Sequence, residues 1–366
     1  MALSQLPAGS QSSNSLFSVL ESAKEPLISV PQCYVRLEQE PTPSELSDSH
    51  KGTFPSIPTI DMTKFVNGET SDFASQLEKL HSTCKDWGIF QLVKHGVSPM
   101  LLEKLKHEVQ VFFKLPLEEK MKYTIRSGDF EGYGNIVKTK DQKLDWGDRF
   151  YMITNPIHRR NPYLFAELPS SLRNTLESYF MELDQLAMRL LGFMVKALKT
   201  EMREIEELFD KDGMQSVRMT YYPPCPQPEL VIGISPHSDA TGITILNQLN
   251  GVDGLQIKKD GVWMPVNFHK DAFVVNVGDI FEMLSNGVYK SIEHRVMVNS
   301  EKERVSVAMF FVPKYEAEIG PLRSLVSPQN PPLFKRIGTE KYVNDFFSRR
   351  RLDGKSYLEQ MKIQNV

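Results

Sequence analysis

The chain has 366 residues, of which 40% are hydrophobic and 24% charged, and its formal net charge is −3 at pH 7. This composition is ordinary for a globular protein of one or two domains, and the small charge gives no indication of binding to nucleic acid or to an anionic membrane. No apolar run approaches the roughly 18 residues that a membrane span needs. The start, "MALSQLPAGSQSSNSLFSVLESAKEPL", lacks the features of a signal or transit peptide. We therefore expect a cytoplasmic protein, acting as a monomer.

The three cysteines, Cys33, Cys84 and Cys225, form no C-x-x-C pair. Their odd, low number argues against a disulfide framework and against a structural zinc site. A reducing compartment fits this usage.

Taken in chain order, the first part of the sequence is mainly helical. Residues 1–55 are rich in Ser, Pro and Glu, and we expect them to form a mobile segment. Apolar residues at helical spacing predict a helix over 71–85, and "GIFQLVKHGV" predicts the strand after it. A second amphipathic helix stops at Pro116, and a long helix is predicted over about 170–198. Residues 56–212 are therefore expected to form a mainly helical N-terminal domain.

From about residue 213 the pattern changes to short β-rich runs separated by turns, such as "VRMTYY", "LVIGIS", "GLQIKK", "AFVVNVG" and "RVSVAMFFV". Many short strands of this kind predict a β-sandwich, a jelly roll or a barrel. We expect residues 213–315 to form a β-rich catalytic domain. A C-terminal helical segment and tail follow over 316–366. The fold class predicted for the whole chain is α+β.

The segment "ISPHSDATGITIL" places two polar groups in a run that otherwise looks built for a core. His237 and Asp239 lie two residues apart, so on a strand they share one face. A buried carboxylate is costly unless it is paired or bound to a metal. His294, in "KSIEHRVMV", offers a third ligand from another predicted strand. Two histidines and one carboxylate form the facial triad that suits non-haem Fe(II) and leaves coordination positions open.

The H-x-D spacing alone occurs by chance in many chains, and for the other histidines an ordinary packing or surface role is the simpler interpretation. A second pair adds specificity. Arg304 and Ser306, in "ERVSVAMFF", again share one strand face. An inward arginine without a protein carboxylate is costly, whereas its planar guanidinium is suited to grip a bound carboxylate. The pair predicts an anionic small molecule beside the metal; the alternative is an exposed arginine next to a coincidental serine.

These motifs, in this order and with "TYYPPCPQPEL" upstream, resemble the plant 2-oxoglutarate- and Fe(II)-dependent dioxygenases of the isopenicillin N synthase-like family. The similarity is greatest to the branch that contains thebaine 6-O-demethylase and codeine O-demethylase. The segments "CKDWGIFQLVKHGV", "FFKLPLEEKMKY" and "VVNVGDIFEMLSNGVYKSIEHRV" extend the resemblance over most of the chain. It implies a double-stranded β-helix (jelly-roll) core flanked by helices, with a mainly helical N-terminal domain.

The resemblance also implies roles for individual residues. His237, Asp239 and His294 become the Fe(II) ligands. Tyr222, Arg304 and Ser306 become the residues that bind 2-oxoglutarate, with ascorbate as the reductant. No catalytic residue beyond the metal centre is implied.

One position departs from the family pattern. The family usually reads N-Y-Y where this chain has Thr220 followed by two tyrosines. A threonine lacks the amide's combination of donor and acceptor, so Thr220 stays outside the predicted set.

Strand alternation also suggests a substrate contact. Phe310 shares a face with Arg304 and Ser306, so it is a candidate platform for a flat aromatic substrate; the alternative is a plain core aromatic. Tyr133, Phe150 and Met152 are further candidates for the pocket wall.

The resemblance implies that a small organic substrate and O₂ react, with release of succinate and CO₂. The substrate expected is a plant specialised metabolite, alkaloid- or flavonoid-like, that is hydroxylated or O-demethylated. Two alternatives remain at this point. One is an oxidase of the same fold that uses ascorbate instead of 2-oxoglutarate, and the other is a non-catalytic metal-binding barrel.

Overall fold

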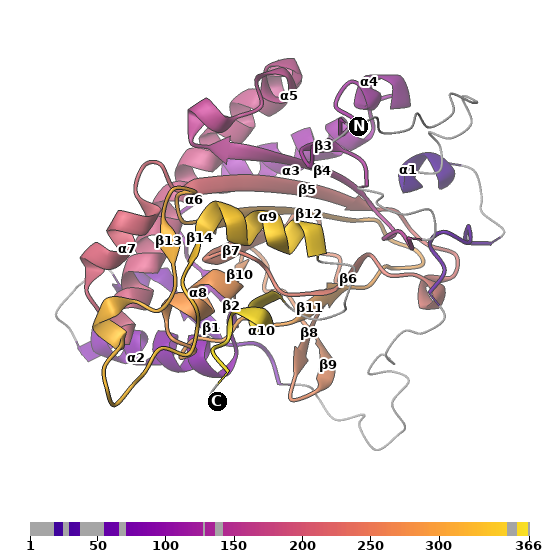
Figure 1. Cartoon of the computed structure of the whole chain (residues 1–366). Coiled ribbons are helices and arrows are strands. Elements are labelled where there is room, and N and C mark those ends of the chain that lie inside the picture. Colours follow the sequence, from indigo (N-terminus) through magenta and orange to yellow (C-terminus); the bar gives the residue numbers. More distant parts are fainter. Residues whose placement is uncertain are drawn as a thin grey trace, which may run out of the picture.

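Two facing sheets form the centre of the computed structural model, which describes residues 18–24, 29–36, 55–65, 71–126, 129–135, 142–349 and 357–364. Within these residues the larger sheet has eight strands in the order β1-β2-β10-β7-β12-β5-β4-β3, and the smaller sheet has four in the order β6-β11-β8-β9 (Figure 1). Nearly all neighbours are antiparallel, with β1 and β2 the parallel pair of the larger sheet. The fold is the predicted α+β class with a jelly-roll core.

The strands of these sheets are β1 (Thr59–Asp61), β2 (Ile89–Val93), β3 (Gly132–Tyr133), β4 (Asp148–Asn155), β5 (Met214–Tyr222), β6 (Ile234–His237), β7 (Ile243–Gln248), β8 (Leu255–Lys259), β9 (Val262–Pro265), β10 (Phe273–Val277), β11 (His294–Val296) and β12 (Arg304–Val312). The helices are α1 (Val19–Ser22), α2 (Ser71–Asp86), α3 (Pro99–Phe113), α4 (Leu117–Met121), α5 (Pro162–Glu167), α6 (Ser170–Leu198), α7 (Met202–Phe209), α8 (Asp279–Leu284), α9 (Thr339–Arg349) and α10 (Tyr357–Met361). A short pair, β13 (Glu318–Ile319) and β14 (Ile337–Gly338), precedes α9. None of the described helices is long and apolar enough to cross a membrane.

On strand β12, one face of the large sheet packs into the hydrophobic core and the other face lines cavities. It pairs in continuous register with β5 on one side and β7 on the other. Its odd positions Val305, Val307, Met309 and Phe311 are buried in the main hydrophobic core. Because successive side chains alternate between faces, the even positions from Arg304 to Phe310 point to the opposite side, where they line cavities.

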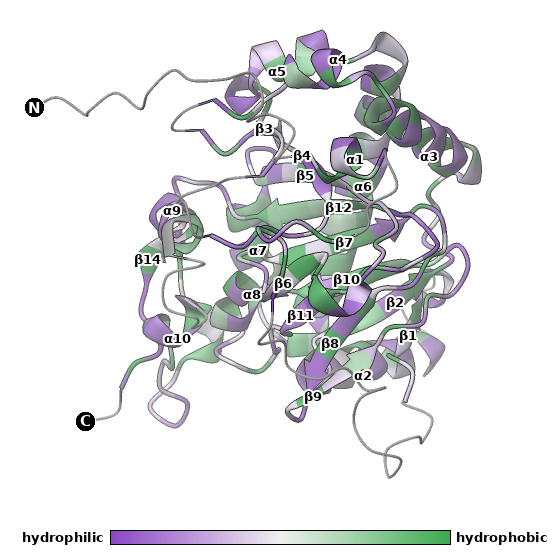
Figure 2. Ribbon diagram, turned by 90° about the vertical axis from the view of Figure 1, so that its right-hand side faces the viewer, coloured by the Kyte–Doolittle hydropathy of each residue, from purple (hydrophilic) through white to green (hydrophobic). Residues whose placement is uncertain are grey.

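The long helix α6 covers the core face of this sheet and matches the helix expected over about 170–198. Its buried stripe recurs at helical spacing, from Leu172 and Leu176 through Leu183 to Leu190 and Met194. The helix ends at Lys199, whose left-handed backbone (φ 57°) closes the last turn. Figure 2 shows mainly hydrophobic residues along the central strands and many hydrophilic ones on the outer helix α3. The core thus lies between the large sheet and the helices α2, α3 and α6.

Strands from both halves of the chain build the large sheet. Strands β1 to β4 lie before residue 213, yet β2 pairs with β10 and β4 pairs with β5. The N-terminal half therefore contributes edge strands to the sheet that carries the site, in addition to its helices.

Two stretches near the N-terminus have defined places, which corrects the expectation of a mobile segment over 1–55 for these residues. Ser18 donates to Oδ2 of Asp148 (2.6 Å), and the Val19 N–H donates to Oδ1 (2.7 Å). The ring of Tyr34 packs edge-on against Trp146, with 5.2 Å between centroids. The hydrogen bonds from Ser18 and Val19 hold the first stretch in place, because they satisfy a carboxylate that is itself fully buried. The ring contact holds the second stretch. Residues 1–17, 25–28 and 37–54 lie outside the described residues.

Candidate active site

Two histidines and an aspartate converge between the sheets. His237 ends β6 and His294 begins β11, and the two residues are directly paired across these antiparallel strands. The Nε2 atoms of His237 and His294 lie 3.7 Å and 3.8 Å from Oδ1 of Asp239. Among the described residues, this is the one group of three His, Cys, Asp or Glu side chains whose ligand atoms lie together closely enough, within 4.8 Å, to hold a metal ion.

Hydrogen bonds behind the three side chains fix how they face the centre. Nδ1 of His237 lies 2.7 Å from the Ser235 carbonyl, and Nδ1 of His294 lies 3.1 Å from the Ile292 carbonyl. A carbonyl can only accept, so each Nδ1 carries the proton and each Nε2 presents a lone pair inward. The other oxygen of the carboxylate, Oδ2 of Asp239, accepts from Thr244 (2.8 Å). The donor set of two neutral imidazoles and one carboxylate fits Fe(II) with open positions.

A cavity of about 470 Å³ adjoins this cluster and contains the predicted anion-binding pair. Arg304 is 1% exposed; its Nε donates to Gln248 (3.2 Å) and its Nη1 to Ser306 (3.4 Å). Its Nη2 is buried without a hydrogen-bond partner, and none of the described residues forms an ion pair with it. Burial lowers the pKa of Arg304, because desolvation disfavours its charged form more than the nearby Tyr222 and Asp253 favour it. An anionic ligand would remove this cost.

Strand register brings the other predicted residues to the same cavity. Tyr222 is paired with Arg304, and the Arg304 guanidinium carbon lies 5.2 Å from the centre of the tyrosine ring. Thr220 is paired with Ser306 and is 3% exposed. The structure therefore places Tyr222, Arg304 and Ser306 together, with Thr220 in the wall of the same cavity.

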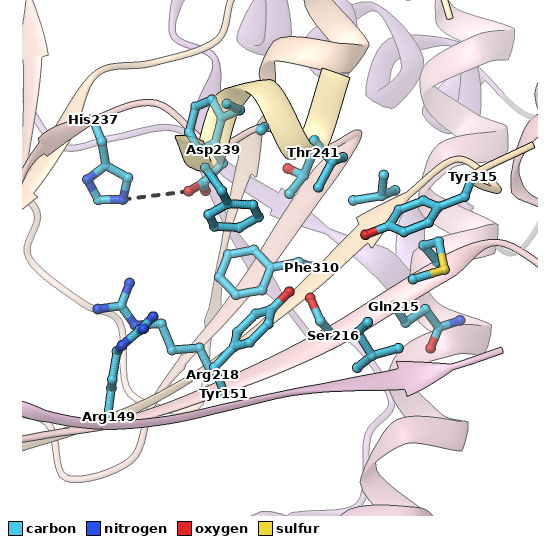
Figure 3. Close-up of a pocket in the computed structure, with 17 residues that line it drawn as sticks. Arg149, Tyr151, Gln215, Ser216, Arg218, His237, Asp239, Thr241, Phe310 and Tyr315 are labelled. Carbon is cyan, nitrogen blue, oxygen red and sulfur yellow. Dashed lines mark ion pairs between the residues drawn. The ribbon is translucent and has the colours of Figure 1, made fainter. Parts of the chain in front are cut away.

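A second, larger pocket of about 700 Å³ opens on the other side of the metal-ligand cluster (Figure 3). Arg218, His237, Asp239 and Phe310 line both this pocket and the smaller cavity. Phe310 lies in the middle of the view between the Asp239 side and Tyr315. Helix α9 supplies further apolar wall residues, listed here together: Val343, Phe346 and Phe347. A ligand in this pocket would lie next to the candidate metal site.

Three residues predicted to line this pocket lie elsewhere. Phe150 and Met152 are 0% and 1% exposed in the main core, and Tyr133 is buried there with its hydroxyl bonded to Asp148. Phe150 packs edge-on against Phe112, on the helical side of the sheet. This corrects the prediction, and the cause is strand alternation: the pocket side of β4 is formed by the intervening residues, namely Arg149, Tyr151 and Ile153.

Other pocket residues were not predicted from the sequence. Ser216 follows from the alternation along β5 that also places Arg218 and Thr220, so that signal was available, whereas Gln215 has the opposite parity and does not follow from it. The α9 side chains and Tyr315 carry no comparable signal, because their position depends on the path of the chain after β12.

A buried carboxylate joins the metal-ligand loop to α9. Asp279, at the start of α8, is fully buried and donates its N–H to the Asp239 carbonyl (2.8 Å). Its Oδ2 accepts from Ser238 (3.1 Å), which stands between two of the metal-ligand residues, and from Tyr342 of α9 (3.4 Å). The helix that walls the larger pocket is thus linked to the metal-ligand loop through one side chain.

The jelly-roll core and the convergent His, Asp and His side chains place the protein among the non-haem iron oxygenases. Residues 213–313 match the family model described as the 2OG-Fe(II) oxygenase superfamily, and residues 57–171 match that of the non-haem dioxygenase in morphine synthesis N-terminal. The chain belongs to the 2OG-Fe(II) oxygenase superfamily, which confirms the resemblance found in the sequence. It is a 2-oxoglutarate-dependent dioxygenase, and its cofactors are Fe(II) and 2-oxoglutarate.

Similar proteins span the whole chain. Oxoglutarate-dependent flavonoid 7-O-demethylase 1 of Ocimum basilicum is 47% identical, over 95% of this chain and 91% of that protein. Codeine O-demethylase of Papaver somniferum is 45% identical, over 95% of this chain and 96% of that protein. The crystal structure of JOX2 in complex with 2OG, Fe and JA has a TM-score of 0.83 and 34% identity, over 95% of this chain and 98% of that one.

Proposed function

We propose that the protein uses 2-oxoglutarate and O₂ to O-demethylate an aromatic plant specialised metabolite, with hydroxylation of the same substrate class as the second possibility. The observation that carries this proposal is the pocket of about 700 Å³ that shares His237, Asp239 and Phe310 with the smaller cavity that contains Arg304. Two similar proteins, at 47% and 45% identity, are O-demethylases by name. In such a reaction an aryl methyl ether, 2-oxoglutarate and O₂ give the phenol, formaldehyde, succinate and CO₂.

Each group in the site has a defined task in this scheme. His237, Asp239 and His294 would hold the iron, which supplies the activation of O₂ when it is bound. The distal carboxylate of 2-oxoglutarate would be held by Arg304, Ser306 and Tyr222. It would accept a hydrogen bond from Nη2 of Arg304, which has no other partner. Phe310 would hold the substrate ring so that its reactive carbon faces the metal, and the α9 side chains would exclude water.

The test is a substrate panel with mass-spectrometric readout. The purified protein is incubated with Fe(II), ascorbate as the proposed reductant, 2-oxoglutarate and O-methylated flavonoids or alkaloids. O-demethylation predicts equal amounts of succinate, formaldehyde and demethylated product, whereas hydroxylation predicts succinate and product without formaldehyde. Product formation without 2-oxoglutarate would instead favour the ascorbate-dependent oxidase, and an iron-loaded protein that forms no succinate with any compound would favour a binding protein. Action as a cytoplasmic monomer stays a prediction from the sequence.

A further inference from the structure

Two arginines stand side by side on the wall of the larger pocket. Arg149 on β4 is paired with Thr220 on β5, and Tyr151 is paired with Arg218. Arg149 and Arg218 are therefore diagonal neighbours on adjacent strands, on the face that lines the pocket. Figure 3 shows both side chains reaching toward the end of the pocket where His237 stands.

Arg218 lines the pocket and one of its nitrogen atoms lacks a hydrogen-bond partner. Its Nε is buried without a hydrogen-bond partner, and no ion pair of the described residues includes it. The Nε of Arg149 donates to the Gly134 carbonyl (3.0 Å), which holds that side chain in place on the wall. A guanidinium is charged at any physiological pH, so two of them at one end of a pocket produce a positive potential there.

Acidic groups that could neutralise this potential are scarce. Asp239 is the one acidic side chain among the described residues that line the pocket, and it belongs to the metal-ligand cluster. Glu131 lies behind the wall, where it accepts the N–H of Ile153 (2.6 Å). Burial raises the pKa of Glu131 to about 7, so this carboxyl carries only part of a negative charge near neutral pH. Among the described residues that line the pocket, a protonated amine would therefore meet the cation of Arg218 and, as an acidic side chain, only that of the metal-ligand cluster.

We infer that the substrate carries a phenolate, carboxylate or other electron-rich oxygen at this end of the pocket, and that protonated amines are rejected. This inference rests on the proposed function and narrows its substrate class to acidic oxygenated aromatics of the phenolic kind, as opposed to basic alkaloids. Phe310 holds the ring and Arg218, with Arg149 beside it, receives the oxygen through charge-assisted hydrogen bonds. The two arginines would thus select substrates by the charge of their polar group, independently of the size of the ring.

The test compares three probes with the same bicyclic ring: 2-naphthoate, 2-naphthylmethanol and 2-naphthylmethylammonium. Binding to the full-length enzyme, loaded with Fe(II) and saturated with 2-oxoglutarate without O₂, is measured by isothermal titration calorimetry. Saturation keeps the carboxylate probe out of the Arg304 cavity. We expect naphthoate to bind more tightly than the alcohol by about 10- to 100-fold, the range typical of a hydrogen bond to a charged group, and the ammonium to bind most weakly.

Variants tie the preference to named side chains. Arg218→Gln should remove most of the preference for naphthoate over the alcohol, and Arg149→Gln should remove a smaller part. Arg203→Gln, on α7, removes an exposed arginine of an ordinary surface ion pair and should leave all three affinities unchanged. The affinity for the uncharged alcohol shows whether the pocket of a variant is intact, since it should change little in a folded variant.

The contrary outcomes are distinct. Tighter binding of the ammonium, or an unchanged preference in Arg218→Gln, would overturn the inferred substrate class. A loss of 2-oxoglutarate affinity in Arg218→Gln with no change in the probe order would assign this arginine to the cosubstrate and overturn the inference as well. In each of these cases succinate formation with the substrate panel would still report separately on the proposed function.

Discussion

The hydroxyl of Tyr342 lies 3.4 Å from Oδ2 of Asp279, the same oxygen that accepts a hydrogen bond from Ser238. Through this pair, helix α9 contacts the segment that carries two of the metal-ligand residues. Because α9 also walls the larger pocket, the position of the helix over a substrate and the position of the metal-ligand loop are coupled.

Tyr342→Phe should therefore lower the fraction of 2-oxoglutarate turnovers that also convert the organic substrate. The ring stays and only the hydroxyl is lost, at a cost of about 1 kcal/mol in stability. We expect less product per succinate and a higher KM for the organic substrate, with the KM for 2-oxoglutarate unchanged. Tyr357→Phe is the matched control, since its hydroxyl bonds to Asp345 and not to Asp279. Equal effects of the two substitutions would show that the Tyr342–Asp279 contact is only structural.

Replacing any metal-ligand residue should abolish turnover. His237→Ala, Asp239→Ala and His294→Ala each remove one of three donors within 4.8 Å of one another, so iron content should fall while the circular dichroism spectrum is retained. His269→Ala, an exposed histidine outside the group, should keep both iron and activity. The measurement is iron by mass spectrometry together with succinate formation. A fully active variant with stoichiometric iron would contradict the assignment.

Arg304→Lys should raise the KM for 2-oxoglutarate far more than that for the organic substrate. Lysine keeps the charge but loses the planar fork, and loss of one partner of a buried charge pair costs about 2–5 kcal/mol, with lysine near the lower end. About 2 kcal/mol corresponds to roughly a 30-fold increase. Arg295→Lys changes an equally buried arginine that stacks on Trp263 instead (4.2 Å), and it should leave this KM unchanged. An unaltered KM in Arg304→Lys would place 2-oxoglutarate elsewhere.

Phe310→Ala should separate substrate binding from 2-oxoglutarate turnover. The ring lines the larger pocket, so its loss should weaken the organic substrate, by less than the roughly 3–5 kcal/mol of a fully buried phenylalanine because it is half-buried. Succinate formation should continue slowly with less product per succinate. Phe311→Ala truncates the neighbouring ring, which faces the core, and should lower stability without changing that ratio. A constant ratio in folded Phe310→Ala would leave Phe310 as a plain core residue.

The buried carboxyl of Glu131 should make stability depend on pH. Burial raises its pKa from 4.5 to about 7, so the folded state binds this proton more tightly than the unfolded chain. The stability contribution is complete below pH 4.5 and is lost as the pH rises to about 7, by up to about 3 kcal/mol. Glu131→Gln should flatten the change in unfolding free energy between pH 5 and pH 8, measured in urea. Glu103→Gln, at an exposed position, should leave the slope as in the parent protein.

The positions of the proposed metal and cosubstrate residues follow largely from strand alternation, although Asp239 lies just beyond the end of β6. Along β12 the register with β5 is unbroken, so simple alternation places Arg304, Ser306 and Phe310 on one face. On β4, the prediction from the sequence placed the apolar residues Phe150 and Met152 in the pocket. They face the helices instead, because the most apolar face of a strand packs into the core, and the pocket receives the mixed face.

The contribution of α9 could not be predicted from local pattern. Its amphipathic sequence indicates a helix that buries one side, but it does not indicate which part of the protein that side packs against. The contact with Asp279 depends on the path of residues 313–338, between the end of β12 and the start of α9, which is a tertiary property.

The strands and α9 contribute different parts of the site. Among the described residues, the candidate metal ligands and the residues proposed to bind 2-oxoglutarate come from the β-rich part of the chain, and α9 contributes to neither group. Substitutions at Val343, Phe346 and Phe347 should therefore change the shape of the larger pocket without removing any residue proposed to hold iron or 2-oxoglutarate. Tyr342 differs from these three residues, because its hydroxyl reaches Asp279. Substrate preference could thus be redesigned on one short C-terminal helix and on the pocket-facing side of β4 while the oxidising machinery is left as it is.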